Sequence, residues 1–375
     1  MIRHGARTSM HSLPGIRPLL VSCQIEDPYR NVSRILNNIK ETWIRKNPKF
    51  GFESWQLYPS NNNCKGSDLT PLGMQQHIIT GKYLGWKYRQ NLNLTKLHIR
   101  STYVSRTYQS AVAVLLGMLT HKELENARIF RSGQLSFCSQ ALFSQSCECP
   151  GADKLLETAS KETDQFERRD QNKQKLITEV SRILGTQISD DVLAYFLIDV
   201  FMTFACHTIS LPCVEHCFSH SHLEMIWEVQ DKLGKNMVFK NQNFIKYVHL
   251  YLHPLLTEIS NRMTNFIRKK QKIESFVLYS GHDITITPLA VVFGIHDGKW
   301  PPFASRIVIE LYKKIESKFH YFIKVLYNGK DVTSDVSFCK NKILKRFCKL
   351  KYFLDFVKNH LRDVGLVSYE NACFV

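Results

Sequence analysis

Apolar residues recur along this chain with the periods of both regular structures. Residues 244–268 are apolar at every third or fourth position, which predicts one long helix with a buried face. Residues 276–279 are all apolar and are followed by Ser280 and Gly281, which predicts a short buried strand. Residues 306–312 and 321–327 alternate between apolar and polar side chains, so we expect a pair of strands there.

Earlier in the chain, Thr70 and Pro71 have the residue types of a helix N-cap and first turn. The apolar positions that follow extend this predicted helix to Leu84. Residues 94–100 are expected to form a short strand, and residues 107–119 an apolar helix.

The order of these elements predicts the fold class. Charged residues dominate 153–184, which favours exposed helices in an insertion. A further helix is predicted to begin at Thr287 and Pro288 and to end at Gly294. Strands that alternate with helices are typical of an α/β sheet, which binds its ligand at the strand ends.

The chain is strongly basic. Its 375 residues include 50 Lys and Arg against 33 Asp and Glu, which gives a formal charge of +17 at pH 7. This charge favours anionic partners, and nucleic acid, acidic glycans, phosphorylated substrates and membrane head groups all fit it. The hydrophobic content of 44% is ordinary for a globular protein and argues against a disordered chain.

Eleven cysteines are many for a protein of a reducing compartment. We predict a set of disulfides formed in the secretory pathway, with the odd count leaving one thiol free or paired outside this chain. Two acceptor sequons for N-glycosylation, at Asn31 and Asn93, point to the same compartment. The longest mostly apolar run, residues 192–206, is interrupted by Asp199 and is shorter than the roughly 20 residues that cross a bilayer. Because no targeting segment accompanies the cysteines, we expect that the natural N-terminus is missing from this chain.

The sharpest chemical feature is the sequence Arg3-His4-Gly5-Ala6-Arg7. A phosphate monoester presents three anionic oxygens, and guanidinium groups match their geometry and stay charged at any relevant pH. Neighbouring positive charge disfavours the imidazolium form, so His4 is kept in the neutral form that can attack phosphorus. Gly5 allows a close approach of the backbone. The motif therefore predicts phosphoryl transfer, with a basic surface patch as the alternative interpretation.

Two other segments carry groups suited to the same chemistry. In Ser280-Gly281-His282-Asp283, which follows a predicted strand, His282 can bond a phosphate oxygen. Asp283 can protonate the leaving alkoxide and then accept a proton from water. Arg106, at the entry to the predicted helix 107–119, can add a guanidinium near backbone amides that favour anions. A structural His–Asp pair and a salt-bridge arginine are the alternatives.

Together these motifs resemble those of the histidine acid phosphatases. The segments 3–7, 105–107 and 281–283 occur in that family's order and spacing, and residues 69–77 are similar to its first long helix. The resemblance implies a nucleophile, His4, a proton donor, Asp283, and four phosphate ligands, Arg3, Arg7, Arg106 and His282. It implies no metal or other cofactor.

The resemblance also implies a two-part fold. A histidine-phosphatase-like α/β core, with helices flanking its sheet, is expected from residues 1–130 and 246–375, and a helical cap subdomain from residues 131–245. The family motif continues with proline where this chain has Ser9, which affects the rigidity of the loop more than the chemistry. The family also has a strand leading into the motif, so we expect the first strand to be truncated here.

Within the family, the similarity extends to the branch that removes the 2-phosphate from the xylose joining glycosaminoglycan to protein. The residues that carry this narrower similarity are 58–62, 253–256, 326–333 and 337–339. The branch implies a phosphorylated glycan or proteoglycan linkage region as partner, a Golgi lumen location, and a membrane anchor that precedes this chain. A broad-specificity lumenal or secreted acid phosphatase is the alternative.

Three other classes of function compete with this hypothesis. Thiols and imidazoles crowd residues 206–222 and can form a zinc site, although their spacing matches no standard finger. A catalytically inactive glycan-binding protein can retain the same fold. The basic and aromatic residues of 340–352 can contact nucleic acid, but the cysteines and sequons favour a lumenal compartment, so no nucleic-acid partner is expected.

Overall fold

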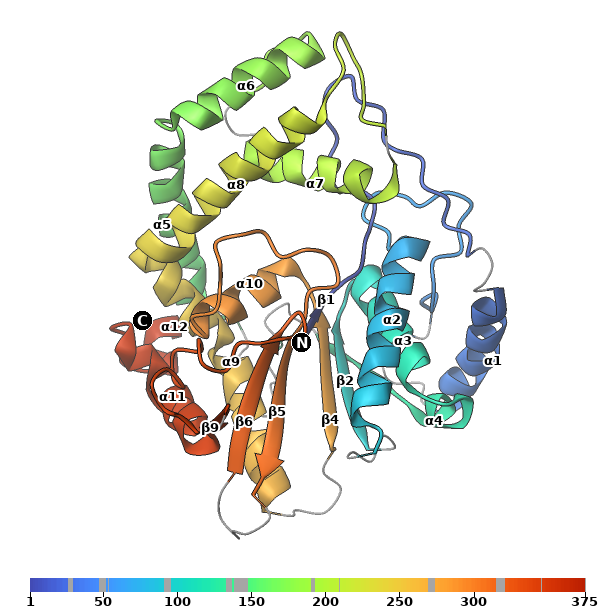
Figure 1. Cartoon of the computed structure of the whole chain (residues 1–375), viewed down its shortest axis with the longest axis vertical. Coiled ribbons are helices and arrows are strands. Elements are labelled where there is room, and N and C mark those ends of the chain that lie inside the picture. The colour runs from blue at the N-terminus through green and yellow to red at the C-terminus, as the bar shows by residue number, and fades with distance from the viewer. Residues whose placement is uncertain are drawn as a thin grey trace.

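The computed structural model describes residues 1–25, 30–46, 52, 54–90, 96–132, 137, 148–189, 193–208, 210–268, 274–314, 321–344 and 346–374. A central sheet stands between helices, and a further group of helices lies over one end of the strands (Figure 1). The fold class is the predicted one, an α/β core sheet flanked by helices.

Parallel strands form the core sheet in the order β1-β4-β2-β3. Their bounds are Ile2–Arg3 for β1, Phe276–Gly281 for β4, Leu97–Thr102 for β2 and Ile129–Ser132 for β3. β1 pairs with β4 at Ser280 and Gly281, so the residues that follow these two strands emerge side by side. His4 therefore follows a paired strand, and truncation of that strand stays a prediction.

A second, antiparallel sheet adjoins β1. It comprises β5 (Ile307–Lys313), β6 (Tyr321–Tyr327), β9 (Phe347–Lys349) and β8 (Ile343–Leu344), with β7 (Lys330–Asp331) paired to β6. An antiparallel bridge between Ile2 and Arg306 joins this sheet to the parallel one. The predicted strand pair at 306–312 and 321–327 is confirmed, in antiparallel pairing.

Helices cover both faces of the core. α2 (Pro71–Tyr88) and α3 (Ser105–Met118) pack so closely that a Cβ on Gly81 would lie 2.1 Å from the Val114 carbonyl oxygen. The other core helices are α1 (Arg30–Lys46), α4 (His121–Asn126), α9 (Gln242–Ile267), α10 (Asp283–Val292), α11 (Leu350–Asp363) and α12 (Tyr369–Phe374). The helix predicted over 244–268 is thus confirmed as α9.

The helices over the strand ends are α5 (Pro150–Glu167), α6 (Gln171–Leu184), α7 (Leu193–His207) and α8 (His220–Lys240). We call them the cap helices. α6, α7 and α8 share an apolar cluster that also contains Leu13 and Ile16, from the segment after the Arg-His-Gly motif. The N-terminal segment therefore runs from the core sheet into the cap. The domain boundaries at 130 and 246 stay predictions.

Local signals were accurate at one helix start and wrong at another. α2 begins as predicted, with the Thr70 hydroxyl accepting a hydrogen bond from the Gly73 N–H at 3.3 Å. α10 begins at Asp283 and not at Thr287, so Pro288 lies inside the helix. A proline there removes one backbone hydrogen bond, and the start signal that it provides in a first turn was misleading. The predicted strand at 276–279 is also longer, because it runs through Gly281.

The predicted disulfides are present. They join Cys23 to Cys64, Cys149 to Cys373, Cys213 to Cys217, and Cys339 to Cys348. Among the described residues Cys206 is a free thiol, whereas Cys138 and Cys147 lie outside them. Asn31 is exposed in the first turn of α1, and Asn93 lies outside the described residues. Over the described residues, no helix has both the length and the apolar character to cross a membrane.

Candidate active site

His4 is held between the two sheets. Its backbone N–H donates to the Gly281 carbonyl at 3.0 Å, and its carbonyl accepts from the Ala304 N–H at 3.0 Å. The preceding Arg3 N–H donates to the Ser305 carbonyl at 2.8 Å. These bonds fix the backbone of His4 at the end of β1, where its side chain is 1% exposed.

Gly5 is required by close packing against α2. A Cβ at this position would lie 2.2 Å from the Gly73 carbonyl oxygen, so no larger residue fits without a shift of the backbone. The Gly5 N–H donates to the Ser110 hydroxyl at 3.1 Å, and the Ala6 N–H to the Gln76 side chain at 2.9 Å. The glycine therefore serves the packing of the loop, besides any approach to a ligand.

The ring of His4 has one nitrogen tied to the backbone. Nδ1 lies 2.9 Å from the Gly5 carbonyl oxygen. A carbonyl oxygen only accepts, so Nδ1 carries the hydrogen and donates it, and the lone pair is on Nε2. Burial lowers the pKa of His4 well below its usual range, and the charges of Arg3 and Arg106 lower it further. The neutral imidazole needed by a nucleophile is thus favoured even in mild acid.

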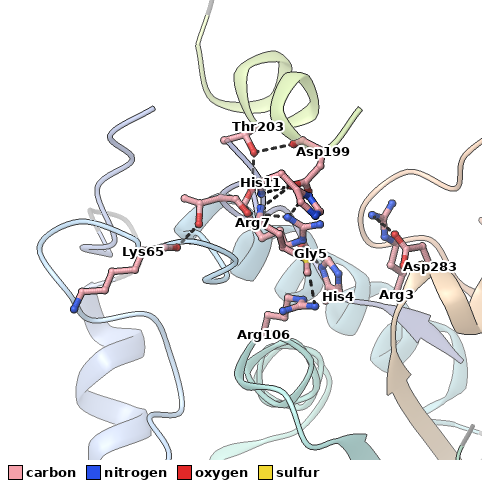
Figure 2. A network of polar contacts seen from close by, with 12 residues as sticks. Arg3, His4, Gly5, Arg7, His11, Lys65, Arg106, Asp199, Thr203 and Asp283 are labelled. Carbon is pink, nitrogen blue, oxygen red and sulfur yellow. Dashed lines mark hydrogen bonds and ion pairs between the residues drawn. The ribbon is translucent and has the colours of Figure 1, made fainter. Parts of the chain in front are cut away.

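His282 and Asp283 follow β4 and lie beside His4. The ring centroids of His4 and His282 are 5.6 Å apart. His282 Nε2 lies 2.9 Å from the Thr102 hydroxyl, at the end of β2. Asp283 Oδ2 accepts from Arg3 Nη2 at 3.0 Å, across 280 positions of sequence. Residues of the two motifs therefore lie side by side in one site, as the sequence predicted (Figure 2).

His282 and Asp283 both have pKa values below the ordinary values of their groups. Burial lowers the pKa of His282, and the Arg106 charge adds to the effect. Burial by itself would raise the pKa of the Asp283 carboxyl, but the Arg3 guanidinium and the Ile284 N–H hold it below its ordinary value. At neutral pH, Asp283 is therefore a carboxylate and His282 is neutral.

The arginines of the two N-terminal motifs surround the same region. Phe303 underlies two of them, with its ring centroid 4.6 Å from Cζ of Arg3 and 5.9 Å from Cζ of Arg7. Arg106 is in the first turn of α3 and is close enough to lower the pKa of His4. Arg7 is 4% exposed and forms an ion pair with Asp199 of α7. All six predicted site residues are thus brought together.

Sequence reasoning missed three residues that contact these groups. Thr102 bonds His282, Phe303 underlies Arg3 and Arg7, and Asp199 binds Arg7. Asp199 had a signal in the sequence, because it is the acidic residue that interrupts the longest apolar run. A buried carboxylate in an apolar helix needs a partner, which predicts a contact with a cation. Thr102 and Phe303 had no comparable signal.

The alternative sites have other structures. Cys213 and Cys217 form a disulfide, so two thiolates of the zinc hypothesis are unavailable. His207 Nε2 lies 2.8 Å from the Thr70 hydroxyl, at the N-cap of α2. In the basic segment 340–352, Nζ of Lys342 and Nζ of Lys351 lie 5.0 Å and 5.1 Å from the centroid of the Tyr352 ring. This segment contributes none of the six site residues. Lys345 lies outside the described residues.

Sequence comparison shows the family of this chain. The chain belongs to the histidine phosphatase superfamily (branch 2), whose sequence profile matches residues 1–328. It is therefore a phosphatase, a phosphoric monoester hydrolase. This confirms the resemblance on which the site prediction rested.

Two curated relatives and one solved structure are similar to this chain. It is 29% identical to 2-phosphoxylose phosphatase 1 of Xenopus tropicalis, over 100% of this chain and 76% of the relative. It is 27% identical to 2-phosphoxylose phosphatase 1 of Homo sapiens, over 99% of this chain and 79% of the relative. The structure of the phytase from Citrobacter braakii matches with a TM-score of 0.62 at 12% identity, over 98% of each chain, which supports the fold alone.

Proposed function

We propose that this phosphatase transfers the phosphoryl group of a monoester to His4 and then to water. One observation carries the proposal: the ring of His4 is buried, bonds the Gly5 carbonyl through Nδ1, so that the lone pair is on Nε2, and lies beside His282 and Asp283. Arg3, Arg7, Arg106 and His282 supply the positive charge and hydrogen bonds for the phosphate oxygens. Catalysis of this kind depends on positioning and on stabilising charge in the transition state.

In the first half-reaction, the lone pair of His4 Nε2 attacks phosphorus from the side opposite the ester oxygen. The P–N bond forms, the P–O ester bond breaks, and the leaving alkoxide takes a proton from Asp283. The guanidiniums of Arg3, Arg7 and Arg106 stabilise the negative charge on the three other oxygens. The result is a phosphohistidine and a free alcohol.

In the second half-reaction, water attacks the same phosphorus atom. Asp283, now a carboxylate, accepts a proton from the water as the P–N bond breaks, which regenerates neutral His4 and releases inorganic phosphate. The bond from Nδ1 to the Gly5 carbonyl keeps the hydrogen on the same nitrogen throughout, so Nε2 is again available.

The proton on Asp283 requires the substrate. The charge of Arg3 holds the pKa of this carboxyl below its ordinary value. A bound phosphate dianion offsets the charge of Arg3 and adds a negative charge near the carboxyl, and both effects raise its pKa. Binding of the substrate therefore favours the acid form that the first step uses, and mildly acidic pH assists it.

The proposed substrate is the 2-phosphate of xylose in the linkage between glycosaminoglycan and protein. The named relatives, similar over almost the whole chain, support this choice. The basic charge of +17 suits a substrate that carries phosphate and a uronic acid. The disulfides and the exposed sequon at Asn31 support a glycoprotein of the secretory pathway, with the Golgi lumen as its proposed location.

The experiment compares phosphate release from a phosphorylated linkage glycopeptide with release from simple alkyl and aryl monoesters. We expect a higher kcat/KM for the glycopeptide. A preference for simple monoesters would replace this substrate with a broad-specificity acid phosphatase activity. His4→Ala is expected to abolish turnover, and equal rates for this variant and the wild type would favour an inactive glycan-binding protein.

Asp283→Asn tests the proton donor separately. Alkyl esters leave as strongly basic alkoxides and need a proton in the transition state, whereas aryl esters with acidic phenols do not. We therefore expect the variant to lower kcat for alkyl phosphates at least about 100-fold more than kcat for aryl phosphates, within the range typical of general acid catalysis. Equal slowing of both classes would remove Asp283 from this role.

A further inference from the structure

The cap helix α7 presents a carboxylate to the loop that follows β1. Asp199 is 4% exposed, and its Oδ1 lies 2.6 Å from Nη1 of Arg7. One turn further along α7, the Thr203 hydroxyl lies 3.4 Å from the Arg7 carbonyl oxygen. Figure 2 shows both residues reaching down from the cap helix to Arg7.

The second oxygen of Asp199 binds the backbone of the same loop. Oδ2 accepts from the N–H of Met10 at 2.6 Å and from the N–H of His11 at 2.9 Å. The His11 ring adds a contact from Nδ1 at 3.0 Å. One carboxylate thus fixes the guanidinium with one oxygen and the course of residues 10–11 with the other.

These contacts fix one corner of the Arg7 guanidinium. Nη1 has two hydrogens, and they are used by Asp199 and by the Thr8 carbonyl, which accepts at 2.9 Å. Nε of Arg7 is buried and has no hydrogen-bond partner among the residues that the structure describes. Because the guanidinium is planar, fixing Nη1 also fixes the direction of Nε. Nη1 therefore has no hydrogen left for a ligand, whereas the N–H of Nε can still donate to one.

We propose that Asp199 is a positioning residue, which orients Arg7 for the phosphate oxygens of the transition state and so links the cap helices to catalysis. This inference rests on the proposed role of Arg7 as a phosphate ligand. In this proposal Asp199 acts through Arg7 and contacts neither the phosphate nor the leaving group.

The charge of Asp199 argues for orientation and against a role in affinity. A carboxylate beside the proposed phosphate site repels an anionic substrate and offsets the attraction of Arg7. Its contribution must therefore come from geometry, which acts on the transition state more than on binding. Loss of the carboxylate is expected to lower kcat while KM and the inhibition constant of inorganic phosphate stay the same or fall.

The test compares Asp199→Asn with Asp170→Asn in the full chain. Asp170 is a matched control, because it is a buried cap aspartate that also binds one cation, Lys232 at 2.5 Å, and two backbone N–H groups. With an aryl phosphate, we expect Asp199→Asn to lower kcat by about 10- to 100-fold, the range for a misplaced catalytic group, and Asp170→Asn to change it less than about threefold. Similar losses in the two variants would overturn the proposal.

A double-mutant cycle with Arg7→Ala separates positioning from general destabilisation. If Asp199 acts through Arg7, then Asp199→Asn causes little further loss in the Arg7→Ala background. Additive losses would overturn the proposal. If Arg7→Ala alone leaves kcat and the phosphate inhibition constant unchanged, the proposed role of Arg7 is wrong, which is a different result.

Asp199→Glu covers the case in which the asparagine variant does not fold. It keeps the charge in the buried site but moves the carboxylate by one methylene, so the fold is expected to be retained. We expect a smaller drop in kcat, again absent in the Arg7→Ala background. An unchanged kcat for a folded Asp199→Glu would also contradict the inference, because its carboxylate no longer meets Arg7 in the same place.

Discussion

Lowering the pH from 7 to 5 is expected to destabilise the fold through three histidines stacked between α9 and α11. His249 Nδ1 lies 3.0 Å from His360 Nδ1, and His253 Nδ1 lies 3.0 Å from His360 Nε2. Burial lowers the pKa of His249 and of His253 to about 4. Burial, together with the two neighbouring imidazoles, lowers the pKa of His360 to about 3.

The direction of the effect follows from proton binding. In the unfolded chain these histidines take up protons below their ordinary pKa of 6.5, whereas in the folded chain they remain neutral to about pH 4. The unfolded state therefore binds more protons in this window, and stability falls as the pH falls from 6.5. At pH 5 each histidine lowers the free energy of unfolding by about 2 kcal/mol, so the three together lower it by at most about 6 kcal/mol. The whole free energy of unfolding of a typical protein is about 5–15 kcal/mol.

The assay is urea unfolding followed by tryptophan fluorescence at several pH values from 7 to 5. His360→Gln removes one titrating group, and we expect its loss of stability by pH 5 to be about 2 kcal/mol smaller than that of the wild type. The comparison uses the change with pH, so a constant loss of packing in the variant does not affect it. His121→Gln, at an exposed position of α4, is the control. Parallel pH curves for the wild type and His360→Gln would refute the reasoning.

Three further predictions concern the candidate active site. Gly5→Ala places a Cβ 2.2 Å from a backbone oxygen and is expected to lower kcat/KM at least about 100-fold. Gly66→Ala, whose Cβ would meet its nearest atom at 3.5 Å, should stay active in the same assay. Thr102→Val removes the hydroxyl beside His282 and is expected to lower kcat/KM about 10-fold and to weaken inhibition by inorganic phosphate. Because the pKa of His4 is well below 6.5 before substrate binds, kcat/KM for an aryl phosphate should not fall as the pH drops through 6.5, and a decrease there in the pH profile would contradict this assignment.

The sequence predicted the regular elements and the chemistry better than the contacts between them. α9 and the β5–β6 pair followed from apolar periodicity, because one face of each is buried. The candidate active-site residues followed from short motifs, since few kinds of side chain can bind a phosphate and transfer it. The start of α10 did not follow, because a proline inside a helix and a proline at its start look alike in sequence.

Apart from the meeting of the two catalytic motifs, contacts between distant segments were beyond the reach of such patterns. The pairing of Asp199 with Arg7 joins residues from the cap and from the first loop, and only the fold brings them together. The same holds for Thr102, the last residue of β2, and His282, which follows the neighbouring strand β4. Local periodicity reports which face of an element is buried, but not which side chain lies opposite it.

The disulfide between Cys149 and Cys373 also bears on how the molecule is made. It spans 224 positions and ties the start of α5 to α12, at the end of the chain. During synthesis, Cys149 emerges long before its partner and meanwhile shares the nascent chain with the thiols of Cys206, Cys213 and Cys217. The Cys149–Cys373 disulfide therefore cannot form until Cys373 has been translated, and any earlier mispairing of Cys149 has to be undone by thiol–disulfide exchange.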